Sequence, residues 1–458
     1  MSIELFDCRE HSEIGPSSNG KYPGDYLEAA SSHQDEARLA VKKLNLHRTP
    51  EQYNTDYYVG ACWLKQREAA LVVRPKIEDL DVFSMFRTCM MDPVVADRLN
   101  ACRTGGIESD DEDVDSVPLY EFDPEDAWIP ISEQYDRLTP LLILDFIFAV
   151  SRVVDHGLKS DYQKRVDHSL PRVRGRVLVN QTLKQHAKGR IERTACEYQN
   201  FTVDCFENRL LKRALLCISR SSVDSNSLGA GVKALLTRSL SSFEKVGTDL
   251  ESVRKLKRQT KNPFFRDYDT AVRLARMVLN RLGWSLSKEE DGVSSVPPFY
   301  INMPLLFELY SYAKLRQTRR SSVTFQVKGF TGYADFVDAD AQLIMDSKYK
   351  LHTRPEGDNR IDKEIVRQLS GYARDQKIRN EVGLNPNDTS IIECLILYPE
   401  PSMVTDKSNG NDFVHLEARK ALDRYCSFSI LPVPVPTRQN YPATNANKPL
   451  HAKGSVAI

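Results

Sequence analysis

The chain has 458 residues, 41% of them hydrophobic, which is enough for two or three domains with large cores. Its 63 basic and 63 acidic side chains cancel, so net charge gives no indication of a nucleic-acid partner, and only the distribution of charge bears on that question. The nine cysteines form no CxxC pair and no regular framework, which excludes a disulfide scaffold and suggests a reducing compartment.

Several classes of protein are disfavoured by missing motifs. The sequence has no Walker phosphate loop and no Gly-x-Ser-x-Gly elbow, so neither nucleotide hydrolysis by this chain nor serine esterase chemistry has support. Its nine histidines show no metal-ligand spacing. The polar start predicts no signal peptide, and no apolar run approaches the roughly 20 residues that span a bilayer. We therefore expect a cytoplasmic protein without a membrane partner.

Residues 1–131 are predicted to form a β-rich N-terminal domain. A polar leader occupies about the first 55 residues, and strand-like segments follow at Tyr57–Trp63 and Ala69–Val73. The acidic run Glu108–Asp115 is typical of a mobile loop.

Residues 132–299 are predicted to form a helical connector. Leu141–Val150 is apolar enough for a buried helix, and helical periodicity returns at 204–220, 227–246 and 264–283. Basic residues outnumber acidic ones from Arg172 to Arg220 and again from Arg254 to Arg266. Such clusters suit a phosphate backbone, although solvated helix faces carry similar charge.

Residues 300–432 have the pattern of an α/β domain with a mixed sheet. A helix is predicted to start near Met303, and it carries Glu308 beside an apolar stripe. A strand hairpin, a helix over 361–380 and the apolar strand Ile391–Tyr398 follow. The proline-rich segment 433–458 is predicted to be a disordered tail.

The hairpin carries the most informative residues of the chain. Its halves are Gly332–Val337 and Leu343–Lys350, and if Asp335 faces Asp346 it folds about residues 340 and 341. Strand alternation then directs Asp346 and Lys348 to one face, and Met345, Ser347 and Tyr349 to the other.

Two carboxylates and an ammonium group gathered in this way suit phosphodiester hydrolysis. Asp335 and Asp346 would hold Mg²⁺, and Lys348 would orient the attacking water or offset developing negative charge. A solvated strand face would carry similar residues. Asp338 competes with Asp335 as the first ligand, and Glu308 is either a third metal ligand or a surface residue.

The helix that follows the hairpin carries two further candidates. Gln368 and Tyr372 are four residues apart and share a face of that helix. Gln368 would hydrogen-bond a catalytic group or DNA, with Tyr372 bracing it. The alternative is an ordinary helix whose tyrosine covers the core.

The series of Glu308, Asp335, Asp346-x-Lys348 and Gln368-x-x-x-Tyr372 resembles the PD-(D/E)xK nuclease superfamily in its Gln-x-x-x-Tyr branch. Asp346–Lys350 more narrowly resembles McrC, the nuclease subunit of McrBC-type modification-dependent restriction systems. The segments that agree with McrC, within residues 55–400, are Tyr58–Gly60, Val72–Ile77, Gly157–Leu158, Arg174–Val177, Lys188–Ile191 and Glu207–Lys212. One departure is Ala334, where the superfamily often has proline.

The resemblance implies a Mg²⁺-dependent DNA endonuclease subunit that acts on modified DNA in antiviral defence. It also implies a partner, an McrB-like AAA+ GTPase hexamer, which the N-terminal half of the chain docks and stimulates. Two alternatives remain open at this point: a RecB-like repair nuclease, and a catalytically silent subunit that regulates the motor.

Overall fold

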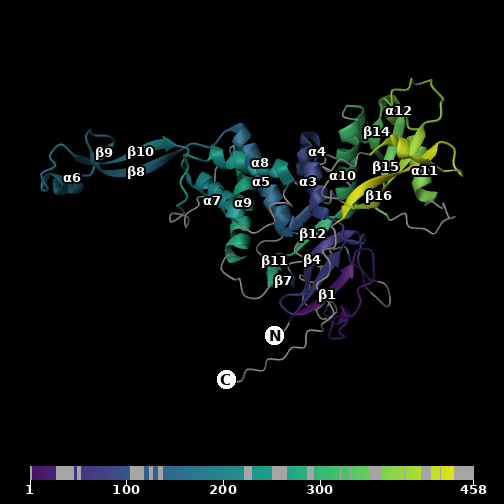
Figure 1. Ribbon diagram of the computed structural model, residues 1–458, viewed down its shortest axis with the longest axis horizontal. Helices are drawn as coiled ribbons and strands as arrows, with labels where there is room; N and C mark the ends of the chain where they lie inside the picture. Colours follow the sequence, from purple (N-terminus) through teal and green to yellow (C-terminus); the bar gives the residue numbers. More distant parts are fainter. Residues whose placement is uncertain are drawn as a thin grey trace. The chain divides into compact units, whose positions relative to one another are not determined.

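The computed structural model is a mixed α+β structure with several sheets, and it divides into two compact units (Figure 1). Unit 1 combines residues 1–129 with 297–458, and unit 2 is residues 130–296. The structure describes residues 3–26, 46–48, 53–103, 118–122, 127–132, 138–220, 229–249, 266–285, 293–319, 321–330, 332–350, 363–385, 387–403, 414–422 and 424–437. The acidic run Glu108–Asp115 and most of the second basic run lie outside these residues.

The N-terminal sheet of unit 1 has five strands in the order β1-β5-β4-β12-β6. Only β1 and β5 are parallel; the other neighbours are antiparallel. The strands are β1 (Glu4–Arg9), β4 (Tyr58–Lys65), β5 (Ala69–Arg74), β6 (Tyr120–Phe122) and β12 (Phe299–Asn302). A short pair, β2 (His47–Arg48) and β3 (Tyr53–Asn54), precedes β4, and the helices α3 (Val82–Met91) and α4 (Pro93–Arg103) follow β5.

Gly60 allows a strand from far along the chain to pack closely in this sheet. Gly60 pairs with Tyr300 of β12, and a Cβ at position 60 would lie 2.1 Å from the Phe299 carbonyl oxygen. Only glycine allows this close backbone approach. Because β12 leads directly into the next helix, the N-terminal sheet and the C-terminal domain form one unit.

The C-terminal sheet of unit 1 is mixed, as expected, with six strands in the order β13-β14-β15-β16-β18-β17. Antiparallel pairing joins β13, β14 and β15, and parallel pairing joins β15, β16 and β18. The strands are β13 (Val323–Lys328), β14 (Tyr333–Asp338), β15 (Leu343–Ser347), β16 (Glu393–Met403), β17 (Lys420–Ala421) and β18 (Phe428–Thr437). The short 3-10 helix η3 (Leu416–Ala418) precedes β17.

Among the described residues, three helices that follow β12 pack on this sheet, and α3 also contacts its strand β18. The first, α10 (Met303–Thr318), starts with Asn302 as its cap and contacts β13 and β15. Its Tyr312 ring stacks near Phe325 and Phe336, with centroids 4.9 and 6.1 Å away. The others, α11 (Lys363–Tyr372) and α12 (Gln376–Glu381), share a second hydrophobic cluster with the sheet. The sequence predicts one helix over 361–380. In the structure the helix is interrupted before Asp375, whose carboxylate caps α12.

Unit 2 contains a helical bundle, in which α5 contacts α8 and α9, and α7 contacts α9. Its helices are α5 (Leu138–His156), α7 (Phe206–Arg220), α8 (Gly229–Ser242) and α9 (Arg266–Ser285). The pair β7 (Ile129–Ser132) and β11 (Val293–Val296) joins its two ends. These four helices lie close to the segments for which the sequence predicts helices.

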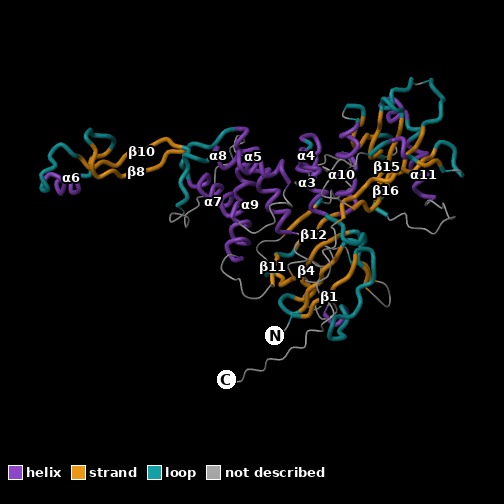
Figure 2. The backbone as a smooth tube through the Cα atoms, viewed as in Figure 1, coloured by secondary structure: helices purple, strands orange, loops and turns teal. Residues whose placement is uncertain are grey.

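A β-arm, which the expected helical connector did not include, also belongs to unit 2. Within this unit, β8 and β10 run side by side away from the helices, with α6 at the far end (Figures 1 and 2). We define the arm as β8 (Asp161–Leu170), β9 (Arg176–Val177), α6 (Val179–His186) and β10 (Thr194–Thr202). Most of the first basic run therefore lies on the arm and the rest on α7.

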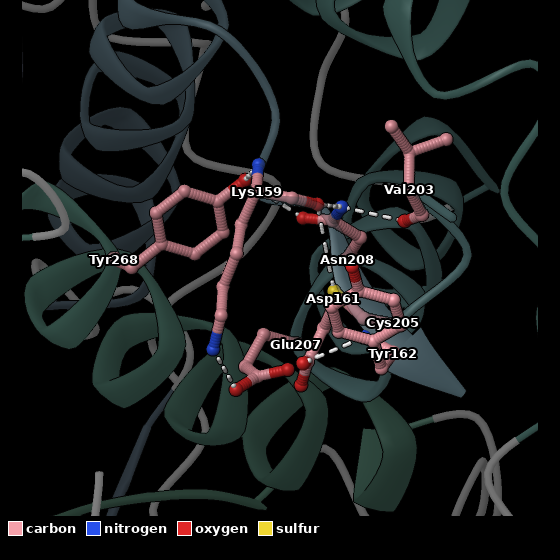
Figure 3. A network of polar contacts seen from close by, with 8 residues as sticks. All are labelled: Lys159, Asp161, Tyr162, Val203, Cys205, Glu207, Asn208 and Tyr268. Carbon is pink, nitrogen blue, oxygen red and sulfur yellow. Dashed lines mark hydrogen bonds and ion pairs between the residues drawn. The ribbon is translucent and has the colours of Figure 1, made fainter. Parts of the chain in front are cut away.

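A network of polar contacts joins the arm to the bundle (Figure 3). The Asn208 amide donates to the carbonyls of Lys159 and Val203, and its oxygen accepts from the Tyr268 hydroxyl at 2.8 Å. The Lys159 ammonium pairs with Glu207 at 2.8 Å. The root of the arm is thus held by satisfied polar groups of α7 and α9.

Two outcomes concern the domain boundaries. β18 runs to Thr437, past residue 432, after which the sequence suggested a tail. β12, near the expected start of the C-terminal domain, pairs in the N-terminal sheet.

Candidate functional site

The hairpin of β14 and β15 has the register that the sequence predicts. Phe336 pairs with Met345, Val337 with Ile344, and Asp338 with Leu343. One step further along the same register, Asp335 faces Asp346. Beyond β15 the chain continues the parallel pairing, because Lys348 N donates to the Leu397 carbonyl at 2.8 Å.

Asp346 and Lys348 form the centre of the site. The Lys348 ammonium lies 2.6 Å from Asp346 Oδ2, and Asp346 is 0% exposed. Burial, with the Asp335 carboxylate adding to it, raises the pKa of Asp346 to about 7. Burial alone would lower the pKa of Lys348, but the Asp346 charge outweighs it and raises that pKa above its usual value. The pair holds a buried carboxylate beside an ammonium group that stays charged at neutral pH.

Asp335 is fixed by the end of the neighbouring strand. Its Oδ2 accepts from both Ser347 N and Ser347 Oγ, each at 2.7 Å. Burial raises the pKa of Asp335, while the bonds from Ser347 act against that rise. Strand alternation had directed Ser347 away from this face. Its hydroxyl reaches Asp335 nonetheless, at the last residue of β15.

Glu308 of α10 also belongs to this acidic group. Burial, and next the Asp335 carboxylate, raise the pKa of Glu308 well above its usual value, with Asp346 adding a smaller contribution. Gln326 Nε2 donates to Glu308 Oε1 at 3.0 Å. Gln326 has a φ of +49°, a strained conformation for a residue inside a strand. No spacing in the sequence pointed to Gln326 or to Ser347.

Gln368 and Tyr372 lie beside the site on α11. Gln368 Nε2 donates to Tyr372 Oη at 2.9 Å. Burial raises the pKa of Tyr372, with further contributions from the charges of Asp346 and Asp335. Gly332, at the start of the hairpin, has a φ of +143°, and a Cβ there would lie 3.1 Å from the tyrosine hydroxyl. The Tyr372 hydroxyl is therefore close enough to the acidic group for its charge to act on it, and Gln368 is bonded to that hydroxyl.

Asp338, the competitor of Asp335, is engaged elsewhere. Arg319 donates to both of its oxygens, at 2.7 and 3.0 Å, and the backbone N–H groups of Asp340 and Ala341 donate to Oδ1. Burial alone would raise the pKa of Asp338, but the Arg319 and Ala341 bonds hold it below its usual value. Asp338 fixes the hairpin turn, which favours Asp335 as the first ligand.

The donor set can be compared with what Mg²⁺ requires. Apart from the Lys348 ion pair, neither oxygen of Asp346 has a hydrogen-bond partner among the described residues. Among the described residues, no group of three or more His, Cys, Asp or Glu side chains is arranged to bind a metal ion. Mg²⁺ commonly binds one or two carboxylates and completes its shell with water and phosphate. Asp335 and Asp346, with Glu308 nearby, fit this open kind of site.

Comparisons with known proteins identify the family of this chain. The model of the family described as McrBC 5-methylcytosine restriction system component matches residues 124–382, more than half of the chain. The curated proteins include no match. None of the helices that the structure describes is long and apolar enough to cross a membrane.

Two solved structures from Thermococcus gammatolerans are similar to this chain. One is a half-complex of a tetradecameric assembly of McrB AAA+ hexamers with bound McrC, at 14% identity and a TM-score of 0.35, covering 94% of each chain. The other is an McrBC complex, at 12% identity and a TM-score of 0.29, covering 68% of this chain and 87% of that chain.

Proposed function

We propose that this chain, which belongs to the McrBC 5-methylcytosine restriction system component family, is the Mg²⁺-dependent DNA endonuclease subunit of such a system. Its C-terminal domain would then have the PD-(D/E)xK fold. The observation that carries the proposal is the buried Asp346 carboxylate beside Lys348, facing Asp335 across the hairpin. Family membership favours restriction over the repair alternative.

Each residue of the site has its own proposed role in phosphodiester hydrolysis. Asp335 and Asp346, assisted by Glu308, would hold Mg²⁺, which polarises the scissile phosphate and acidifies a bound water. Lys348 holds its proton and would offset negative charge that develops on the phosphate. Gln368, which is bonded to Tyr372, would orient a phosphate oxygen or the attacking water.

A motor partner is the second part of the proposal. The chain has no phosphate-loop motif of its own, and one similar structure contains McrB AAA+ hexamers with bound McrC. We expect a partner of that kind here, which hydrolyses GTP and recognises the modified DNA. The chain would dock this ring and stimulate its hydrolysis.

The arm extends the docking surface beyond the N-terminal half, where the resemblance places docking. It carries the exposed apolar side chains Val173, Val179, Leu183 and Ile191 among basic residues. Exposed apolar groups that cluster on a projecting element are typical of protein-binding surfaces. We therefore include the arm in the surface that contacts the motor.

The test is cleavage of a plasmid carrying 5-methylcytosine, with the purified chain, its cognate AAA+ subunit, GTP and Mg²⁺. The proposal expects double-strand cuts that need Mg²⁺ and are absent from unmodified plasmid. Asp346→Ala should be inactive while it still binds the AAA+ subunit. Metal-independent cutting, or full activity of Asp346→Ala, would remove the nuclease assignment.

A further inference from the structure

Two residues of the N-terminal sheet meet the chain just after Lys348. β1 and β5 are parallel, so the residues that follow them emerge at the same edge of the sheet. Glu10 follows β1, and its N–H donates to the Arg74 carbonyl at 2.8 Å. Lys76 follows β5, and its N–H donates to Glu10 Oε1 at 3.0 Å. Strand topology thus brings an acidic and a basic side chain together.

Both side chains hold Tyr349, the residue after Lys348. The Tyr349 hydroxyl donates to Glu10 Oε1 at 2.7 Å, and the Lys76 ammonium donates to the Tyr349 carbonyl. The same ammonium lies 3.8 Å from the centroid of the Tyr349 ring. The Tyr349 ring also lies 5.9 Å, centroid to centroid, from the ring of Phe307, the neighbour of Glu308. The contacts therefore fix the backbone beside two of the proposed site residues.

These contacts hold the chain at the point where backbone hydrogen bonds of the C-terminal sheet end. β15 ends at Ser347, and Lys348 makes the last parallel backbone bond to β16. Tyr349 lies outside the strand ladder, although it is only 4% exposed. Glu10 and Lys76, beside the N-terminal sheet, contact its ring, hydroxyl and carbonyl. Glu10 and Tyr349 are 339 residues apart in the sequence.

Burying these charged groups is costly. Glu10 is 1% exposed, and its Oε2 has no hydrogen-bond partner among the described residues. Burial raises the pKa of Glu10 to about 7, against the attraction of Lys76, and burial lowers the pKa of Lys76 to about 8. Replacing a buried charged pair by apolar residues is often neutral or stabilising, so stability alone does not account for this one.

We propose that Glu10 and Lys76 are positioning residues for the nuclease site, which hold the Tyr349 backbone so that Lys348 stays against Asp346. The inference rests on the proposed function and deepens it. It makes the N-terminal sheet part of the catalytic apparatus without contact to DNA or metal. A change in the N-terminal sheet would then alter cleavage through Tyr349.

The test compares buried carboxylates at the two ends of β1. Glu10→Ala removes the Tyr349 contact, Glu10→Gln keeps an oxygen acceptor, and Tyr349→Phe removes the donor. The matched control is Glu4→Ala, because Glu4 is 5% exposed and accepts from Ser17 and Asn19 at 2.6 and 3.0 Å, away from Tyr349. Each full-length variant is assayed with the AAA+ subunit, GTP, Mg²⁺ and methylated plasmid.

We expect Glu10→Ala and Tyr349→Phe to lower kcat about tenfold, with KM changed less than about twofold, because positioning errors act on the chemical step. Glu10→Gln should recover most of kcat, and Glu4→Ala should keep wild-type kcat even if it melts earlier. Equal losses for Glu10→Ala and Glu4→Ala would overturn the proposal, since they would reflect stability alone.

A second measurement is independent of cleavage. Amide hydrogen exchange of residues 343–350 should accelerate in Glu10→Ala and stay at the wild-type rate in Glu4→Ala. If the wild-type chain cuts no DNA, the proposed function fails, and this exchange still decides whether Glu10 holds the segment. Unchanged exchange in Glu10→Ala, or faster exchange with wild-type kcat, would each overturn the positioning role.

Discussion

At the scale of single residues, the proposed catalytic role would account for the cost of burying Asp346. Its carboxylate lies beside two others whose pKa values are also raised, which strains a metal-free fold. We predict that Asp346→Ala and Lys348→Ala lose DNA cleavage in Mg²⁺, by at least about a hundredfold. Circular dichroism and binding to the AAA+ subunit should stay at wild-type levels. Retained cleavage by either purified variant would contradict these roles.

The raised pKa of Asp346 also gives a prediction for pH. The folded pKa, about 7, lies above the unfolded value of about 3.9, so the folded state binds this proton more tightly. The stability from Asp346 is therefore present at acid pH and is lost as pH rises through 7. In EDTA, the melting temperature of Asp346→Asn relative to wild type should increase from pH 5 to pH 8. Mg²⁺ should raise the wild-type melting temperature more at pH 8 than at pH 6. A pH-independent difference between the two proteins would contradict the assignment.

Gln368 and Tyr372 are predicted to support the site. Since Gln368 Nε2 donates to the Tyr372 hydroxyl, the two side chains hold each other in place. Gln368→Ala should lower kcat about tenfold, whereas Tyr372→Phe keeps the packed ring and should cost at most about threefold. Wild-type rates for both would leave the pair with a packing role only. Single-turnover cleavage rates at saturating DNA measure this directly.

The sequence predicts the site residues whose positions follow from strand alternation, and it misses those whose positions depart from it. The facing of Asp335 and Asp346 follows from a two-residue period and a short loop, so the hairpin register could be deduced. Gln326 and Ser347 could not be found in that way. Gln326 reaches Glu308 from a strained backbone, and Ser347 departs from strict alternation at a strand end.

At the scale of elements, the arm depends on its root. Asn208 is fully buried and its side chain joins Lys159, Val203 and Tyr268 (Figure 3). Asn208→Ala leaves these buried groups without their partner, which should cost about 1–3 kcal/mol of unfolding free energy. Asn200→Ala, at a half-buried position of β10 where the side chain makes only a long 3.5 Å contact with Arg174 among the described residues, should cost less than about 0.5 kcal/mol. Urea unfolding of both variants measures the difference, and equal losses would contradict the role of this network.

Element prediction succeeded where apolar periodicity was strong. The buried helix α5 and the strand β16 both follow from their apolar runs. The arm strands gave no such signal, because β8 is largely exposed on both faces and buries no apolar face. The break between α11 and α12 arises from a cap at Asp375, a local hydrogen bond that periodicity does not register.

At the scale of the whole molecule, strand β12 limits how the chain can be divided. It pairs with β4 and β6 and continues directly into α10. A fragment that starts near residue 300 would carry part of a strand without its partners. The sequence suggested a boundary there because the change from connector to α/β pattern is visible, whereas pairing with a distant strand is not. The separate roles proposed for different parts of the chain, motor stimulation and DNA cleavage, are therefore best tested with point variants of the full chain.

The last prediction separates motor stimulation from DNA cutting. Asp346 lies in unit 1, whereas Leu183 and Ile191 lie on the arm of unit 2, 58% and 74% exposed. If docking uses the arm, the double variant Leu183→Asp with Ile191→Asp should lower stimulation of GTP hydrolysis at least about tenfold, since charge would replace apolar contacts. Asp346→Ala should stimulate as wild type does, because it leaves the docking surface intact.

The control is Ile391→Asp, which alters an isoleucine of unit 1 that is 71% exposed, close to the exposure of Ile191. It should leave stimulation unchanged. Phosphate release by the AAA+ subunit is measured for each variant over a range of concentrations. No stimulation by the wild-type chain would remove the motor-activating role altogether. Wild-type stimulation by the double variant would instead return docking to the N-terminal sheet, from which Glu10 and Lys76 contact the residue after Lys348.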